Sequence, residues 1–307
     1  MKTQLALIPS ILFPLFVLSS CGGSSDDDDR SIDSTGSQVE DIASSNDESV
    51  ELDSEPVTGL VRFLTENFDS VSSLEIIGNF VLTDEQDVQG AIARLNQADA
   101  CLLERLDGST IVSTGGFVDI PFGFTPPRAF AGDEIAINAD GSLFQNLGVN
   151  FVRGSLYTLN PPDANPIAGP LPSNVTVTIP GGTMVQSFTN EPVPDVEGVV
   201  VLNPDFSVLD RNAGFQWAAP TISVENSRMT VEVVLDTPVD NESAFSLRCS
   251  LVDDGLFLFP EELAPIIDQV GVDNIDFTRT NWRTVQNGST TLHLLNEERL
   301  SPLCCSI

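Results

Sequence analysis

The chain has 307 residues and a formal net charge of −32, because 45 aspartates and glutamates stand against 13 lysines and arginines. Lys2 is its only lysine. A protein that neutralises nucleic-acid phosphates or docks on anionic lipid needs a basic face, which this composition does not supply, so we exclude a nucleic-acid partner. The length suits one large domain or two of ordinary size.

The first residues have the pattern of a secretory signal peptide. Met1-Lys2 supplies a short positive start, and Leu5–Val17 is apolar apart from two prolines and one serine. A charged start, a short apolar stretch and small residues before a cleavage point are typical of such a peptide. The apolar stretch is shorter than the roughly 20 residues that span a bilayer. We therefore predict a signal peptide at residues 1–20 and no permanent transmembrane anchor.

The residues that close this stretch, Leu18-Ser19-Ser20-Cys21, resemble the bacterial lipobox. The resemblance covers only the start of the chain. It implies that the thiol of Cys21 receives a diacylglyceryl group and that cleavage leaves Cys21 as the first mature residue. Several acyl chains on one residue hold a protein firmly to a membrane, so we predict that Cys21 is a lipid anchor. The alternative is an ordinary signal peptide that contains a cysteine.

The stretch after the cysteine is predicted to be an acidic, disordered tether over residues 21–57. From Gly22 to Glu55 it holds twelve acidic residues and a single base, Arg30. Such a segment buries too little apolar surface to offset its ordering entropy, and its charges repel one another and extend it. The residues beyond Glu55 hold the other 33 acids and 11 arginines.

The lipobox resemblance also implies a location. In enteric lipoproteins, aspartate directly after the cysteine retains the protein at the inner membrane. This chain has Gly22 there, and its first aspartate is Asp26. The resemblance therefore implies an exported protein anchored in the outer membrane of a Gram-negative bacterium, and leaves open which leaflet it occupies.

Beyond the tether, the sequence predicts strands far more often than helices. Met229–Leu235 and Ala244–Val252 alternate apolar and polar residues, the pattern of a half-buried strand. Further candidates are Thr176–Ile179, Gly198–Leu202 and Gly288–Leu295. Short, frequent strands separated by Gly, Pro, Asn and Asp favour a mainly β fold with an antiparallel, sandwich-like architecture.

Two stretches instead have helical spacing. Asp84–Ala98 places Val88, Ile92 and Leu95 on one stripe. Pro260–Val270 begins with proline and two glutamates, which suits a helix N-terminus. Its predicted apolar face consists of Leu263, Ile266, Ile267 and Val270.

Prolines around residues 192–204 indicate a connection. We therefore predict a β-rich domain with one helix at residues 58–203. A second, sandwich-like domain at residues 204–307 would hold a short helix and a cysteine-containing tail. A single continuous sandwich is the alternative.

Four cysteines remain if Cys21 is acylated: Cys101, Cys249, Cys304 and Cys305. An even number in an exported protein indicates disulfides, and four cysteines allow three pairings. A bond between the adjacent Cys304 and Cys305 would be strained. We favour one or both of them tying the tail to Cys249 or Cys101, with buried free thiols as the alternative.

Counting residues excludes several catalytic classes. The chain has one histidine, His293, so sites with several imidazole ligands are excluded. Serine-lysine dyads, P-loops and kinase chemistry all need a lysine that the mature chain lacks. A Ser-His-Asp triad would have to use His293, for which we favour a strand position opposite a core face. Trp217 and Trp282 are predicted to pack in a core. These absences favour a protein without enzymatic activity.

Calcium is the only cofactor that the motifs raise. Two short stretches offer oxygen ligands beside a glycine, as a hard cation requires: Asn138 and Asp140 in one, Asp253 and Asp254 in the other. Neither continues as an EF-hand loop. Turns between strands produce the same strings, and we favour that interpretation.

Gly115–Phe130 carries four phenylalanines among glycines and prolines. If exposed, it would be an apolar loop suited to a protein partner. A loop folded over its own domain is the favoured interpretation.

Together these features predict a lipid-anchored envelope protein that acts as a non-enzymatic binding or accessory module, with a protein partner in the envelope. The alternative is a glycan-binding or carboxylate-based hydrolytic module, assisted by calcium.

Overall fold

The computed structural model describes residues 55–68, 71–82, 92–93, 95–105, 108–117, 129–150, 156–159, 166–203, 209–221, 226–235, 245–268 and 270–301. They all belong to one compact unit, Glu51–Ile307. The predicted signal peptide, Cys21 and nearly all of the predicted tether lie outside the described residues. Within those residues, no helix is both long enough and apolar enough to cross a membrane.

The fold is mainly β, as predicted, and is built on one large sheet of fourteen strands. These strands are β1 Val57–Phe68, β2 Val71–Leu82, β3 Ala100–Arg105, β4 Thr110–Thr114, β5 Glu134–Ala139, β6 Ser142–Asn150, β7 Leu156–Leu159, β8 Ile167–Ala168, β9 Val175–Ile179, β10 Phe188–Pro192, β12 Ser227–Leu235, β13 Phe245–Leu251, β15 Val272–Asn287 and β16 Thr290–Leu300. Two further strands, β11 Phe215–Gln216 and β14 Leu256–Phe257, form a separate small sheet. The helix α2, Ala264–Ile267, is a single turn.

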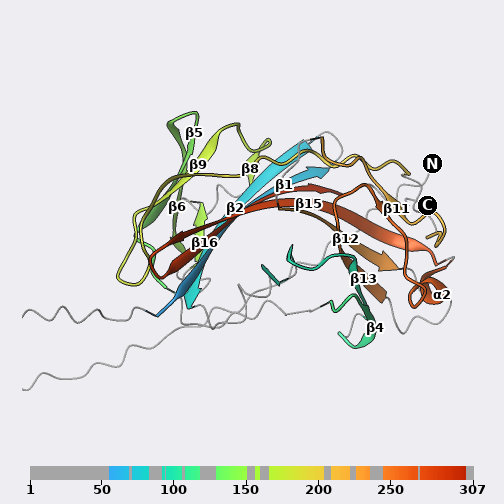
Figure 1. Ribbon diagram of the computed structural model, residues 1–307. Helices are drawn as coiled ribbons and strands as arrows, with labels where there is room; N and C mark the ends of the chain where they lie inside the picture. The colour runs from blue at the N-terminus through green and yellow to red at the C-terminus, as the bar shows by residue number, and fades with distance from the viewer. Residues whose placement is uncertain are drawn as a thin grey trace, which may run out of the picture. The chain divides into compact units, whose positions relative to one another are not determined.

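The strand order in the large sheet is β10-β9-β5-β6-β7-β2-β1-β16-β15-β12-β13-β3-β4, with β8 paired to β2 beside this path. The neighbours pair antiparallel except at its centre, where β1 and β16 run parallel. In Figure 1, β5, β6 and β9 lie towards one end of β15, and β12, β13 and α2 lie towards the other.

One face of this sheet carries two separate hydrophobic cores. The first gathers residues from Val57 to Val193 together with Leu292 and Leu294. The second gathers residues from Leu209 to Phe277 together with Cys101 and Leu103. Along β15, Phe277 packs in the second core and Val285 against the first. Their separation by eight residues puts both on one face of the strand.

Each core therefore takes strands from both sides of residue 203. β16 completes the first core and β3 completes the second. β3 reaches the second core by pairing with β13, and β1 joins β16 across the middle of the sheet.

The strand predictions are confirmed where alternation was strongest. Met229, Val231, Val233 and Leu235 of β12 are buried on one face, and Leu247, Cys249 and Leu251 of β13 are buried likewise. β9 and β16 correspond to the two other predicted strands that formed. Gly198–Leu202 forms only an isolated bridge, between Val201 and Trp217.

The two helix predictions are confirmed in part. Ile92, Ala93 and Leu95 are helical. Residues 84–91 and 94 of this predicted helix lie outside the described residues. α2 is shorter than the predicted helix because Pro260–Leu263 forms a turn before it. Leu263 and Ile267 are buried, but Ile266 is exposed, so its assignment to the apolar face is wrong.

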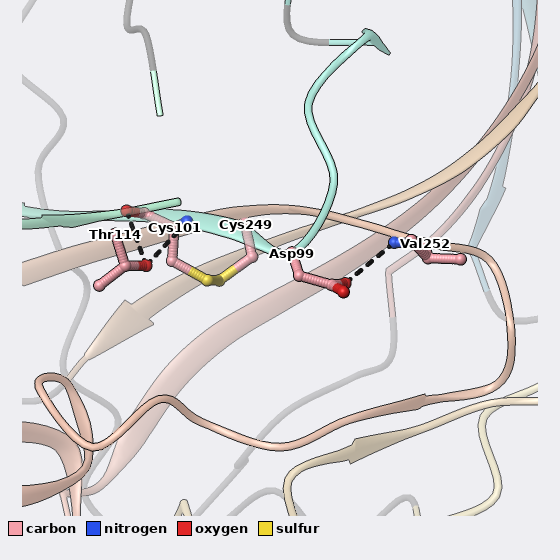
Figure 2. Close-up of a disulfide and its surroundings, with 5 residues drawn as sticks. All are labelled: Asp99, Cys101, Thr114, Cys249 and Val252. Atoms are coloured by element: carbon pink, nitrogen blue, oxygen red, sulfur yellow. Dashed lines mark hydrogen bonds between the residues drawn. A yellow bond between two sulfur atoms is a disulfide. The ribbon is translucent and has the colours of Figure 1, made fainter. Parts of the chain in front are cut away.

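A disulfide joins Cys101 to Cys249, which face each other on β3 and β13 with their Cα atoms 4.1 Å apart (Figure 2). Both cysteines are completely buried. Thr114 of β4 exchanges hydrogen bonds with the backbone of Cys101 at 3.2 and 3.5 Å, and Val252 N donates to Asp99 at 3.2 Å. The expected bond from the tail to either cysteine is therefore wrong, because they pair with each other. Cys304 and Cys305 lie outside the described residues.

Candidate functional site

A small layer of three extended segments covers the second core. Leu202 N donates to Gln216 O at 3.0 Å and Ala218 N donates to Val200 O at 2.8 Å, which joins residues 199–203 to β11. β11 in turn pairs with β14, and Trp217 N donates to Gly255 O at 3.0 Å. We call residues 199–203, 215–218 and 254–258 the small layer.

The inner face of the small layer is aromatic. Phe215, Trp217 and Phe257 are buried in the second core. The Phe215 ring packs edge to face against the Phe277 ring of β15, with the ring centroids 5.8 Å apart. Such a pair adds stabilisation beyond that of burying the two rings. Gly214 directly precedes β11 and has a φ of +59°, and a Cβ atom there would lie 2.0 Å from Phe257 O. A side chain at position 214 would therefore push the strands of the layer apart.

The outer face of the small layer is apolar and exposed. Val200 is 56% exposed, Leu202 59%, Leu256 49% and Leu258 55%. Because side chains alternate along an extended segment, these residues point away from the core that Val201, Phe257 and Phe259 enter. Gln216 lies between Leu202 and Leu256, since it pairs with both segments. We call Val200, Leu202, Leu256 and Leu258 the outer apolar face.

One buried arginine holds all three segments of the small layer to the large sheet. Arg279 of β15 is 1% exposed. Its guanidinium donates to Glu197 O at 3.3 Å and Gly198 O at 3.1 Å, beside the first segment. It also donates to Ala218 O at 2.6 Å, in the second segment. Asp253, beside the third segment, accepts from it at 2.8 and 3.2 Å.

Asp253 completes this buried network. Besides Arg279, its carboxylate accepts hydrogen bonds from Trp217 Nε1 at 2.8 Å and from Ser227 Oγ of β12 at 2.8 Å. A buried ion pair is tolerated when further hydrogen bonds satisfy its remaining atoms, and that condition is met here. Asp253 was a calcium candidate, and these contacts favour a structural role instead.

Of the other calcium candidates, Asp140 and Asp254 lie in turns and Asn138 lies near the end of a strand. Asp140 has φ +49° and Gly141 φ +75°, and they form the two-residue connection between β5 and β6. Asn174 Nδ2 donates to Asp140 Oδ1 at 2.8 Å, and Asn138 is the next-to-last residue of β5. Leu256 N donates to Asp254 Oδ1 at 3.3 Å. These contacts support the turn interpretation. Among the described residues, no three His, Cys, Asp or Glu side chains are grouped as metal ligands.

His293 lies in β16, on the face opposite Leu292 and Leu294, as its sequence context predicts. Its Nδ1 is 2.9 Å from Thr284 Oγ1 on the neighbouring strand. Burial lowers the pKa of His293 below its ordinary value of 6.5. The two tryptophans are buried as predicted. Trp282, however, lies on the same side of the large sheet as His293, opposite the two cores, where it packs with Leu95 and Leu295. We call this side the second face.

Two carboxylates on the second face of the sheet form ion pairs. Glu297 lies 2.5 Å from Arg62 Nε and accepts from Thr280 Oγ1 at 3.3 Å. Burial acts to lower the pKa of Arg62, but the charge and hydrogen bond of Glu297, with the charges of Glu75 and Glu232, outweigh it and raise the pKa. Arg248 Nη2 pairs with Glu104 at 2.6 Å in the same way.

Charges around the small layer are predominantly acidic. In residues 197–203, 209–221 and 253–268, the exposed charged side chains are Asp210, Arg211, Asp254, Glu261 and Glu262. Arg211, the one base among these five, lies 3.8 Å from Asp268. Asp254 belongs to the same segment as Leu256 and Leu258, and the other three exposed carboxylates lie in segments that lead into or out of the small layer.

Comparison with known proteins yields no similarity: no family model, no curated protein and no solved structure matches the chain. Of the predicted apolar loop, residues 118–128 lie outside the described residues, and Phe130 is exposed.

Sequence reasoning missed the outer apolar face and Arg279. Leu256-Phe257-Leu258-Phe259 is apolar at every position, so alternation did not tell which side faces solvent. The only signal for Arg279 was a charged residue inside a strand.

Proposed function

We propose that this protein is a lipid-anchored, non-enzymatic component of the bacterial outer membrane, and that it binds another envelope protein through the outer apolar face. The anchor is supported by the lipobox-like residues that end at Cys21. Several acyl chains on that residue would hold the folded part near the membrane. The acidic stretch that follows would act as an extended tether.

The outer apolar face is the observation that carries the binding proposal. Single exposed apolar residues need no explanation, whereas grouped ones mark interaction sites. Four of them, each about half exposed, share one face of a layer only three segments wide. Arg279 anchors all three segments, so the face is held in one arrangement. A preorganised face loses less entropy on binding.

The test is site-specific photo-crosslinking in the native host. A photoreactive phenylalanine analogue replaces Leu202, and crosslinked proteins are isolated from solubilised membranes and identified by mass spectrometry. We expect one discrete partner. A second protein with the analogue at Leu143, an equally exposed strand leucine (61% against 59%) in β6, is the matched control. A Cys21→Ala variant is the unanchored control, and it should lose both membrane fractionation and the crosslink.

Leu202→Ser with Leu256→Ser should abolish binding to the identified protein, whereas Leu143→Ser should leave it unchanged. These substitutions at exposed positions are expected to change stability by less than about 0.5 kcal/mol, which a thermal melt verifies. Equal crosslinking from positions 202 and 143, or full binding by the double variant, would refute the proposal.

A further inference from the structure

The acidic surroundings of the outer apolar face restrict the chemistry of its partner. Asp254 lies within the small layer, two residues before Leu256. Glu261 and Glu262 follow Leu258 along the chain, and Asp210 begins the turn that leads into β11. Arg211, the one exposed base in these segments, is engaged with Asp268. A partner that covers the leucines therefore approaches Asp254 directly and comes near the segments that carry the other three carboxylates.

A second copy of this chain does not suit such a face. Two copies that met through the same face would place like charges opposite one another, as a two-fold interface requires. Like-charge contacts across an interface cost affinity. The chain as a whole is also strongly acidic, with a net charge of −32, so copies repel one another at long range. Anionic lipid is disfavoured for the same reason.

We infer that the partner is a different protein, with an apolar contact surface rimmed by lysine and arginine. This inference rests on the proposed function and names the partner's chemistry. The leucines exclude water and supply the contact energy. The carboxylates steer the basic rim during encounter, which raises the association rate. Because the rim carboxylates are exposed, salt screens them within about 8 Å at physiological ionic strength.

The experiment uses the protein crosslinked at position 202, purified, and the full mature chain. Dissociation constants and association rates are measured by biolayer interferometry at 50, 150 and 500 mM NaCl. We expect affinity to fall roughly tenfold or more over this range, mainly through the association rate, as electrostatically steered complexes do. Glu261→Gln with Glu262→Gln should weaken binding at low salt and flatten the salt dependence.

The matched control neutralises two exposed acids beside the first core, Asp133→Asn with Glu134→Gln. It removes the same net charge. If the rim carboxylates act locally, this control should change affinity and its salt dependence clearly less than Glu261→Gln with Glu262→Gln does. Equal effects from the two double variants would overturn the inference, because only the overall charge would then matter.

The failures of the two proposals are distinguishable. Binding that is insensitive to salt and to Glu261→Gln/Glu262→Gln, but abolished by Leu202→Ser/Leu256→Ser, overturns the basic-rim inference and leaves the proposed function standing. A dimer in sedimentation velocity that Leu202→Ser/Leu256→Ser dissociates overturns the inference in favour of a second copy. Loss of the position-202 crosslink itself overturns both proposals.

Discussion

At the scale of single residues, Arg279 decides how the small layer is attached. Its guanidinium makes five hydrogen bonds, to Glu197, Gly198, Ala218 and Asp253. Three of these are backbone carbonyls of segments with few strand hydrogen bonds of their own. The planar guanidinium suits this task because it offers several donors in a fixed fork. Asp253 then compensates the buried charge.

Arg279→Met should destabilise the protein by about 3–5 kcal/mol, because it leaves the Asp253 carboxylate buried without its counter-charge. Arg279→Met with Asp253→Leu should cost less than the sum of the two single variants, since the residues act as a pair. Urea unfolding of the three variants and wild type measures this coupling. Additive losses would contradict the structural role assigned to the pair.

His293 gives a prediction about pH. Its folded-state pKa is lowered by burial below the ordinary value of 6.5, so the unfolded chain takes up its proton first as the pH falls. Stability linked to His293 is therefore present above pH ~6.5 and lost as the pH falls towards the lowered value. Because the chain has one histidine, a single imidazole signal in NMR reports this pKa directly.

His293→Gln should remove this part of the stability loss between about pH 7 and pH 5. Unfolding curves of wild type and variant across that interval test it. A titration midpoint for the histidine at or above 6.5 would contradict the effect of burial.

At the scale of elements, the disulfide holds an edge of the large sheet. β3 and β4 end the strand order, and β3 meets the rest of the sheet through β13. β3 also precedes β13 by a long stretch of chain, because Cys101 and Cys249 are 148 residues apart. Closing so long a loop carries a high entropy cost in the absence of the bond.

Replacing both cysteines by alanine should lower the free energy of unfolding by about 2–5 kcal/mol, the range seen when native disulfides are removed. Urea unfolding of the double variant against wild type measures it. The oxidation state is checked by thiol titration in denaturant. A loss well under 1 kcal/mol would show that packing of β3 against the second core suffices.

At the scale of the whole molecule, two cores share one sheet. β15 contributes to both, and β16 pairs with its residues Phe277–Asn287. The polar residues Arg279 and Asn281 lie between the two cores on that face, and Asn281 Nδ2 donates to Asp195 O at 2.6 Å. The segment that crosses from the first core to the small layer is thus fixed to β15, the strand that the two cores share.

Because the cores share β15 and lie on one sheet, we expect them to unfold in one cooperative transition. Leu294→Ala in the first core and Leu247→Ala in the second are matched, since both leucines are completely buried strand residues. Each should lower the free energy of unfolding by about 2–5 kcal/mol. Each should also lower the midpoint temperature of the same calorimetric transition. Two separate transitions, each sensitive to only one variant, would contradict shared unfolding.

Several features of this protein were determined by the sequence alone. Alternation along Met229–Leu235 predicted both the strand and the buried side of β12. The turn at Asp140-Gly141 was favoured from its residues, since that pair readily adopts positive φ. Local backbone preference and side-chain alternation suffice for these features, because they involve residues that are adjacent in the chain.

Other features were decided only by the tertiary structure. The pairing of Cys101 with Cys249, the parallel contact between β1 and β16, and the exposed side of Leu256 and Leu258 all depend on residues distant in sequence. An extended strand offers two edges and two faces, and its own residues do not choose between partners that are equally apolar. That choice is made by the packing of the whole molecule, since only the assembled cores decide which apolar side chains remain in contact with water.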